Sequence, residues 1–184
     1  MLNKKLFLPE YVVQFLIDEY AFNPARPVKL KISYISFKDI FSEYKKIFEN
    51  VAASYIVSTK TIYINTDTLS NSTLNLIETI IHEIHHYNQH MMWNYSLSFR
   101  KSWVNDFALP DGFSINNLHK LSFFNLIEFW SRHYEYKNAP HEFEAIKWAS
   151  ENLKNAVHKI YENFVEIDTN IKDTYVRNNN AIRV

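Results

Sequence analysis

The stretch SYIVSTKTIYINTDTLSNSTLNLIETIIHEIHHYNQH, residues 54–90, changes its apolar period once and therefore predicts two kinds of secondary structure in succession. Its first part holds two runs of β-branched and aromatic side chains around Ser58, Thr59 and Lys60, which is typical of a hairpin. From Leu74 onward the apolar residues recur at the spacing of a helix. The polar segment between them is rich in residue types that cap helices. The stretch therefore predicts a hairpin followed by an amphipathic helix.

The helix predicted over residues 74–90 carries four of the eight histidines in the chain. A projection at about 100° per residue separates an apolar side from a polar side. The polar side includes Asn75, Glu78, Thr79, His82, Glu83, His85, His86, Gln89 and His90. An ordinary surface helix with solvated histidines has the same partition, so amphipathicity alone does not indicate a site.

The sequence HEIHH within this helix matches the pattern His-Glu-x-x-His, which zinc metalloproteases carry on a helix. Residues four apart lie on one face of a helix, so His82 and His86 can bind one ion through their imidazoles. Glu83 lies beside them and is the predicted general base. Other ligand registers stay open, because His85 also shares a face with His82, and His90 continues the polar side.

A catalytic zinc site usually has three protein ligands and an open fourth position, so a third ligand must come from another segment. The segment YKNAPHEFEAIKWA, residues 136–149, predicts a helix that begins near Pro140. Projection places Ile146 on its apolar face and Glu142 near the centre of that face, where an unpaired carboxylate is unfavourable. Glu142 is therefore the predicted third ligand, unless it caps the first turn or reaches solvent. Glu144 projects to the opposite side and is the alternative.

Composition excludes several classes of partner and site. Twenty basic and twenty acidic side chains cancel to a formal charge of zero, so no global field attracts nucleic acid or an anionic membrane. The chain has no cysteine, so a metal must be bound by His, Asp or Glu. Acidic residues and Pro9 interrupt the apolar N-terminal run before a signal sequence forms, and no apolar stretch is long enough to cross a bilayer. We therefore expect a cytoplasmic protein that binds neither nucleic acid nor membranes.

Periodicity along the chain predicts an α+β fold with a small sheet and a mostly helical C-terminal half. The 184 residues suffice for one core and show no internal repeat, so residues 1–184 are predicted to form a single domain. Besides the hairpin and the histidine helix, the expected elements are helices over residues 9–20, 37–48, 121–132 and 140–165, a strand over 28–34 and a variable middle over 91–120.

A hairpin ending in TIYIN, the sequence HEIHHYNQ, a tyrosine, a proline and EFEAIKWA together resemble the small intracellular zincins of bacteria and their phages. The resemblance covers residues 53–90 and 133–150. It implies a zincin-like fold with the gluzincin ligand set, in which His82, His86 and Glu142 bind Zn²⁺. It also implies metallopeptidase activity on a peptide or protein substrate.

The mechanism of such a zinc site implies how neighbouring residues contribute. Glu83 accepts a proton from the attacking water and passes it to the leaving amine. The developing oxyanion needs a further donor, and among His133, Tyr134 and Tyr136 we favour Tyr136 as this second catalytic residue. Many relatives have Asn or Asp four residues after the ligand glutamate, where it orients a histidine, but this chain has Ile146 there. Another residue must therefore orient the histidine.

Two other functions fit parts of the pattern. Glu83 and His86 also form a Glu-x-x-His motif, which di-iron helical proteins use twice, but the chain contains no second copy. A non-catalytic metal-binding or protein-interaction module is the other alternative, and a structural zinc site in it would have four protein ligands and no open position. The number and placement of the ligands therefore distinguish these functions.

Overall fold

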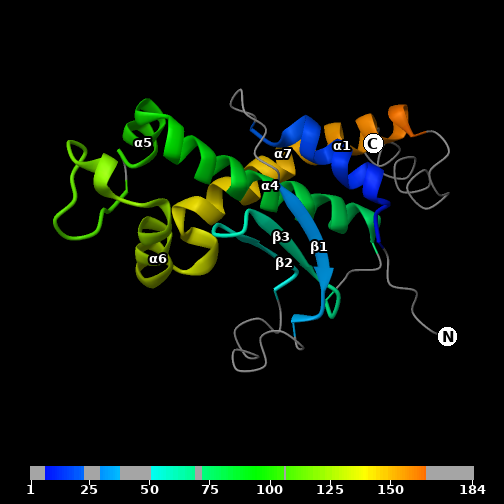
Figure 1. Cartoon of the computed structure of the whole chain (residues 1–184), viewed down its shortest axis with the longest axis horizontal. Coiled ribbons are helices and arrows are strands. Elements are labelled where there is room, and N and C mark those ends of the chain that lie inside the picture. The colour runs from blue at the N-terminus through cyan, green and yellow to red at the C-terminus, as the bar shows by residue number, and fades with distance from the viewer. Residues whose placement is uncertain (1–6, 23–29, 38–50, 69–71, 106, 165–184) are drawn as a thin grey trace, which may run out of the picture.

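The computed structural model describes residues 7–22, 30–37, 51–68, 72–105 and 107–164, and in these ranges the chain is α+β, as the sequence predicts. Figure 1 shows a small sheet lying against long helices. The described elements are α1 (Glu10–Tyr20), β1 (Lys31–Ile35), β2 (Ala53–Ile56), β3 (Thr61–Asn65), α4 (Thr73–Tyr95), α5 (Leu97–Trp103), η2 (Leu118–Lys120), α6 (Phe123–His133), η3 (Tyr136–Asn138) and α7 (Pro140–Asn163), of which η2 and η3 are single 3₁₀ turns.

The sheet has the strand order β1-β3-β2, so β3 is its central strand. β1 runs parallel to β3, and β2 runs antiparallel to it. β2 and β3 form the predicted hairpin, whose turn contains Lys60 in the left-handed region at a φ of 51°. Ile62 and Ile64 of β3 are fully buried, which anchors the hairpin to the core. β2 is an outer strand of the sheet, and the edge of β2 that is not paired with β3 faces the site described below.

The long helix α4 carries the histidine motif. It begins at Thr73, where the side chain of Ser72 accepts a hydrogen bond from the backbone N–H of Asn75. It extends to Tyr95, beyond the predicted end at residue 90, because neither glycine nor proline interrupts the additional turn. The helix therefore reaches past the sheet and meets α5 and α6 (Figure 1).

The polar side of α4 is covered by α7, which begins at Pro140 as predicted. Glu83 and Gln89 are buried on this side, so α4 is not the solvated surface helix that its amphipathic pattern also allowed. Ala145 and Ala149 of α7 are buried, and their small side chains let the two helices approach closely. The close approach brings polar residues of both helices together.

The buried apolar residues form two clusters. The main core joins α1, the sheet, α4 and the C-terminal part of α7. The second, which we call the aromatic cluster, lies where α4 meets α5 and α6. Its buried members are Trp93, Trp103, Val104, Leu118, Leu121, Phe123, Leu126 and Trp130. The site lies between these two clusters.

The remaining predicted elements have different outcomes. α6 begins at residue 123 and not at 121, because Ser122 caps it by accepting a hydrogen bond from the backbone N–H of Asn125. The segment predicted to be variable contains α5 and η2. The predicted helix over 37–48 lies outside the described residues after its first position. Among the described helices, none combines the length and the apolar character that crossing a membrane requires.

Candidate metal centre

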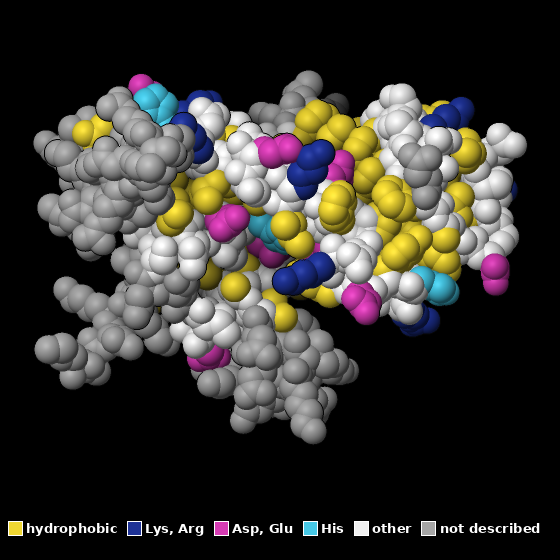
Figure 2. Space-filling view, turned by 180° about the vertical axis from the view of Figure 1, so that it is seen from behind, with side chains coloured by type: hydrophobic (Ala, Val, Ile, Leu, Met, Phe, Trp, Pro, Cys, Tyr) yellow, Lys and Arg dark blue, Asp and Glu magenta, His cyan; other side chains and the backbone are white. Residues whose placement is uncertain are grey.

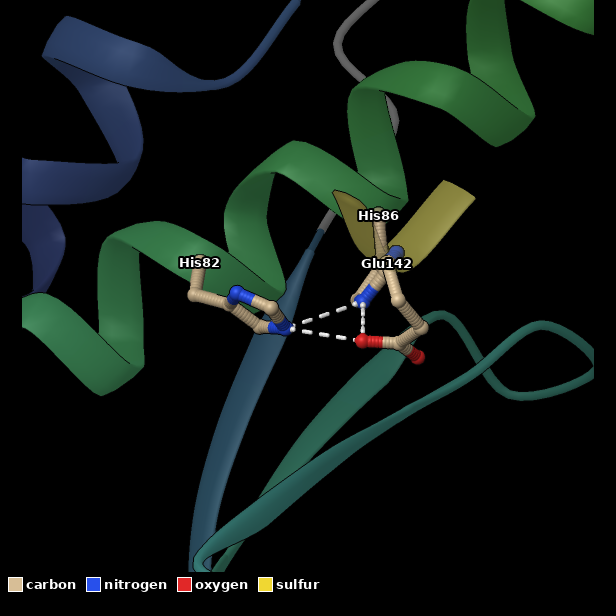
Figure 3. Close-up of side chains that lie close together, drawn as sticks. All are labelled: His82, His86 and Glu142. Carbon is tan, nitrogen blue, oxygen red and sulfur yellow. Dashed lines mark hydrogen bonds and ion pairs between the residues drawn. The ribbon is translucent and has the colours of Figure 1, made fainter. Parts of the chain in front are cut away.

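Three side chains that the sequence analysis selected as ligands lie together between α4 and α7. Nε2 of His82 is 3.1 Å from Nε2 of His86, and Oε2 of Glu142 is 3.4 Å from each of these nitrogens. Figure 3 shows the three side chains pointing toward one another, with both histidines on α4 and the glutamate on α7. The predicted spacing of four residues and the predicted third ligand thus converge on one position.

Local sequence explains this convergence. Residues i and i+4 of a helix lie one above the other, so His82 and His86 project in the same direction from α4. Pro140 starts α7 only two residues before Glu142, which therefore lies in the first turn and faces α4. The three side chains expose only 15%, 12% and 10% of their surface, so water solvates them poorly.

The separations of the ligand atoms fit a tetrahedral zinc ion. With zinc–ligand bonds of about 2.05 Å, two ligands of a tetrahedral site lie about 3.3 Å apart. The three observed separations of 3.1, 3.4 and 3.4 Å lie close to this value. Two imidazole nitrogens and one carboxylate oxygen are also a ligand set that zinc accepts. Oε2 of Glu142 is buried and has no hydrogen-bond partner, as expected for an atom that is placed to bind a cation.

The charges of the three side chains depend on one another in the metal-free protein. Burial alone would raise the pKa of Glu142, but the nearby Nε2 atoms of His82 and His86 and the positive charge of His86 hold it well below its usual range. Burial alone would lower the pKa of His86, but the Glu142 carboxylate, with its negative charge 3.4 Å away, raises it to about 9. In the metal-free protein, a proton on His86 therefore supplies the positive charge beside Glu142 that a bound cation would otherwise supply.

Glu83 lies beside the ligand group and is itself buried. Its Oε2 accepts a hydrogen bond of 2.7 Å from the backbone N–H of Tyr55 in β2. This bond fixes the direction of the carboxylate and ties the outer strand to α4. Burial raises the pKa of Glu83, and the positive charges of His86 and His82 oppose that increase.

Two cavities meet at the ligand group. One, of about 530 Å³, extends from Glu83, His86 and Glu142 to β2 and α6. The other, of about 670 Å³, lies on the His82 side and reaches Glu78 and Asn75. Figure 2 shows histidine and acidic side chains recessed in this face of the molecule, with hydrophobic side chains around them. The group is therefore open to an entering molecule on both sides.

Tyr136 lines both cavities and stands at the boundary between them. Its side chain is largely exposed, yet burial of the hydroxyl and the negative charges of Glu142 and Glu83 raise its pKa. The hydroxyl therefore stays protonated at neutral pH and can donate a hydrogen bond. The predicted oxyanion donor thus lies at the site, whereas His133 and Tyr134 do not line either cavity.

The other histidines of α4 are not part of the ligand group. His85 stacks on Trp148 at a ring distance of 4.7 Å, and its Nε2 lies 3.7 Å from Oε2 of Glu144. His90 forms a hydrogen bond of 2.9 Å with the hydroxyl of Tyr55. Within the described ranges, the ligand group contains only the two histidines four residues apart and the glutamate.

Two details of the helix projection for α7 are wrong. Glu144 does not face away from α4, because its Oε2 accepts a hydrogen bond of 2.8 Å from Nε2 of Gln89. Ile146, placed on the apolar face, is instead 41% exposed and lines the cavity on the His82 side. Both errors have one cause: α7 presents its first turns to a polar side of α4, so the buried face of α7 consists of polar and small side chains where it passes the site.

Two residues beside the ligands were not predicted from the sequence. Gln89 is 1% exposed and contacts His86 through its side chain. His141 is buried, its Nε2 lies 3.5 Å from Oε1 of Glu142, and burial lowers its pKa to about 4. Gln89 was visible only as one more polar residue of the helix, and His141 only as the neighbour of Glu142. Neither role is apparent until α4 and α7 are placed together.

Comparison of the chain with protein-family models, curated proteins and solved structures found no match. The interpretation of the site therefore rests on its own residues and their geometry.

Proposed function

We propose that the protein is a zinc-dependent hydrolase, specifically a zincin-like metallopeptidase that cleaves peptide bonds. The observation that carries the proposal is the triangle of His82, His86 and Glu142 donor atoms, whose sides match those of a tetrahedral zinc site. Three ligands with cavities beside them also favour a catalytic site over a structural one, which would need a fourth protein ligand. The described residues offer no second such group, which a di-iron centre would need.

Zinc bound at this position would acidify a water molecule and polarise the carbonyl of the scissile bond. Glu83 takes one proton from the attacking water, so that an oxygen–carbon bond forms at the carbonyl carbon. The same carboxyl group then gives the proton to the amide nitrogen as the carbon–nitrogen bond breaks. Its bond to Tyr55 N–H holds Oε2, which leaves Oε1 for the proton transfer. The Tyr136 hydroxyl donates a hydrogen bond to the oxygen on which negative charge develops.

The shape of the cavity between β2 and α6 fits a polypeptide substrate. One wall of the 530 Å³ cavity is β2, an outer strand whose unpaired edge, apart from the Tyr55 N–H that is bonded to Glu83, can pair with an extended peptide. The opposite wall carries Phe123, Phe124 and Ile127 of α6, which suit a large apolar side chain. We therefore expect cleavage next to apolar residues of an unfolded or extended chain.

Replacement of Glu83 by Gln tests the function because it separates chemistry from metal binding. Glu83→Gln keeps the shape of the side chain but removes the proton acceptor, so turnover should fall about 10²- to 10⁴-fold. Zinc content should stay at one ion per chain, since Glu83 is not a ligand. The measurements are elemental analysis of protein purified without chelator and mass spectrometry of cleavage products from a peptide library.

Matched variants set the controls. His86→Ala should lose zinc and activity together, whereas His85→Ala should keep the zinc. Glu151→Gln, on the exposed side of α7, should change neither quantity. Absence of zinc from the wild-type protein would reject the metal site. Zinc without any cleavage, or equal cleavage by Glu83→Gln, would reject the peptidase mechanism.

A further inference from the structure

The side chain of Gln89 lies at the centre of the contact between α4 and α7. Its Oε1 is 3.0 Å from Nδ1 of His86. Its Nε2 donates two hydrogen bonds, one of 2.8 Å to Oε2 of Glu144 and one of 3.0 Å to the backbone carbonyl of His141. The residue is 1% exposed, so these three contacts satisfy its amide without bulk water.

The chemistry of these partners fixes the orientation of the amide. The Glu144 carboxylate and the His141 carbonyl only accept hydrogen bonds, so the NH₂ group of Gln89 must face them. The amide oxygen then faces His86 and needs a donor, which places a hydrogen on Nδ1 of that ring. A neutral imidazole with its hydrogen on Nδ1 has its lone pair on Nε2. That nitrogen is the one that points toward His82 and Glu142.

We propose that Gln89 is a positioning residue of the metal centre, which holds His86 in the tautomer and ring orientation that presents Nε2 to the metal. The proposal rests on metal binding by His82, His86 and Glu142, as in the proposed function. The sequence left open which residue orients the metal-binding histidine, because Ile146 has no polar atom. The proposal assigns this role to Gln89.

Gln89 also links the two helices that supply the ligands. Glu144 and the His141 carbonyl belong to the first turns of α7, which hold Glu142 between them in sequence. One amide thereby connects the ring of His86 to the backbone that positions Glu142. Loss of this amide should loosen both ligands at once, so its effect on metal affinity should exceed that of an ordinary buried hydrogen bond.

The test compares two neighbouring buried amides of α4. Gln89→Met removes the three hydrogen bonds at similar volume. Asn88→Leu removes the bonds of Asn88 to the backbone of Tyr20 and Phe22, which lie away from the site. Zinc affinity is measured by competition with a chromophoric chelator, and ligand geometry by the visible spectrum of the Co²⁺-substituted protein. Gln89→Met should bind zinc about 10- to 100-fold more weakly and shift the Co²⁺ spectrum. Loss of a hydrogen-bond partner of a metal-binding histidine usually weakens metal affinity by this amount.

The control separates positioning from general destabilisation. Asn88→Leu should lower the melting temperature of the metal-free protein but leave zinc affinity and the Co²⁺ spectrum unchanged. Equal zinc affinity of Gln89→Met and wild type would overturn the proposal for Gln89 while leaving the zinc site in place. Absence of zinc from wild type would overturn the proposed function and this inference together.

A rescue variant protects the test against simple misfolding. Gln89→Glu alone brings two carboxylates into contact at positions 89 and 144, so it should weaken zinc binding and stability. Adding Glu144→Gln restores a donor at that contact and leaves a carboxylate facing Nδ1 of His86, and only the hydrogen bond to the His141 carbonyl is not restored. The double variant should recover zinc affinity to within about tenfold of wild type. A double variant as weak as Gln89→Glu would show that the polarity of this contact does not set the metal affinity, and would overturn the proposal.

Discussion

His86 and His90 lie one turn apart on α4, yet they belong to two regions that shift the pKa of a buried histidine in opposite directions. At the polar contact between α4 and α7, burial is outweighed by Glu142, and the pKa of His86 rises to about 9. At the border of the aromatic cluster, burial and the charge of Lys60 lower the pKa of His90 to about 4. The neighbours supplied by other elements, and not the position on the helix, therefore decide the charge of each ring.

The two regions also differ in how completely their polar atoms are paired. In the aromatic cluster, the indole N–H of Trp93 donates to the carbonyl of Leu121, and that of Trp130 donates to the carbonyl of Ala108. At the polar contact, Oε2 of Glu142 is buried without a hydrogen-bond partner. The comparison indicates that the aromatic cluster stabilises the fold, whereas the polar contact keeps a buried acceptor without a donor, as the proposed metal site requires.

Truncation in the aromatic cluster should have the largest effect on stability. Trp93 is 1% exposed, so Trp93→Ala leaves a large cavity and an unpaired carbonyl at Leu121. The free energy of unfolding of the metal-free protein should fall by about 3–5 kcal/mol. Urea unfolding followed by circular dichroism measures it. Trp93→Phe keeps most of the ring and should lose less than half as much, and a loss below about 1 kcal/mol in Trp93→Ala would mean that this cluster does not carry the stability.

Much of the site could be predicted from sequence because its geometry is local. A helix places residues four apart on one face whatever surrounds it, so His82 and His86 followed from their spacing in the His-Glu-x-x-His motif. Glu142 followed from its place among apolar residues just after Pro140. The hairpin before α4 followed from alternation and turn residues, which also act over short distances.

The parts that were missed depend on how distant elements meet. Gln89 has no recognisable role until α7 supplies two acceptors on one side of it and leaves His86 on the other. The exposure of Ile146 follows from the polar character of α4 where α7 passes it. The aromatic cluster was not predicted as a unit: Trp93 and Trp103 lay in the variable middle and Trp130 in a predicted helix, and these tryptophans come from three separate helices with no common period.

Acid should destabilise the protein through the histidines on the aromatic side. The pKa of His90 is about 4 in the folded chain and about 6.5 in an unfolded one, so the unfolded state binds the extra proton first. The free energy of unfolding should therefore fall as pH drops from 6.5 to 4, by up to about 3 kcal/mol for this group. His141, whose pKa is also about 4, should add to the same slope.

A single substitution tests how much His90 contributes to the pH dependence of the free energy of unfolding. His90→Asn keeps an acceptor for the hydroxyl of Tyr55 but does not titrate, so its stability should depend less on pH between 6.5 and 4. His119→Asn changes an exposed histidine and should leave the slope as it is in wild type. The measurement is urea unfolding of the metal-free proteins at half-unit pH steps. Identical slopes for His90→Asn and wild type would show that His90 is not held neutral by its surroundings.

The smallest of the three stability effects is expected for Glu142 at the polar contact. Burial of its carboxylate alone suggests one sign for this effect, and the surrounding histidines reverse it. If the Glu142 carboxylate were isolated, its burial would be destabilising, and Glu142→Gln would stabilise the metal-free chain. Glu142 is not isolated, however: its pKa is held low by His82 and His86, and that of His86 is raised to about 9. The depressed pKa of Glu142 adds stability above its unfolded value near 4.5, and the raised pKa of His86 adds stability below about 6.5 and loses it as pH rises through 9.

At pH 6 both contributions are present, so Glu142→Gln should lower the free energy of unfolding of the metal-free protein by about 1–2 kcal/mol, with a smaller loss above pH 9. Glu144→Gln is the matched control, because the side chain of Glu144 is 39% exposed and water can replace part of its contacts. It should change stability by less than about 0.5 kcal/mol at either pH. Urea unfolding of the two variants at pH 6 and above pH 9 measures both losses. An increase in stability for Glu142→Gln at pH 6 would mean that the histidines do not compensate the buried charge without metal, and the two regions would then differ less than their histidines suggest.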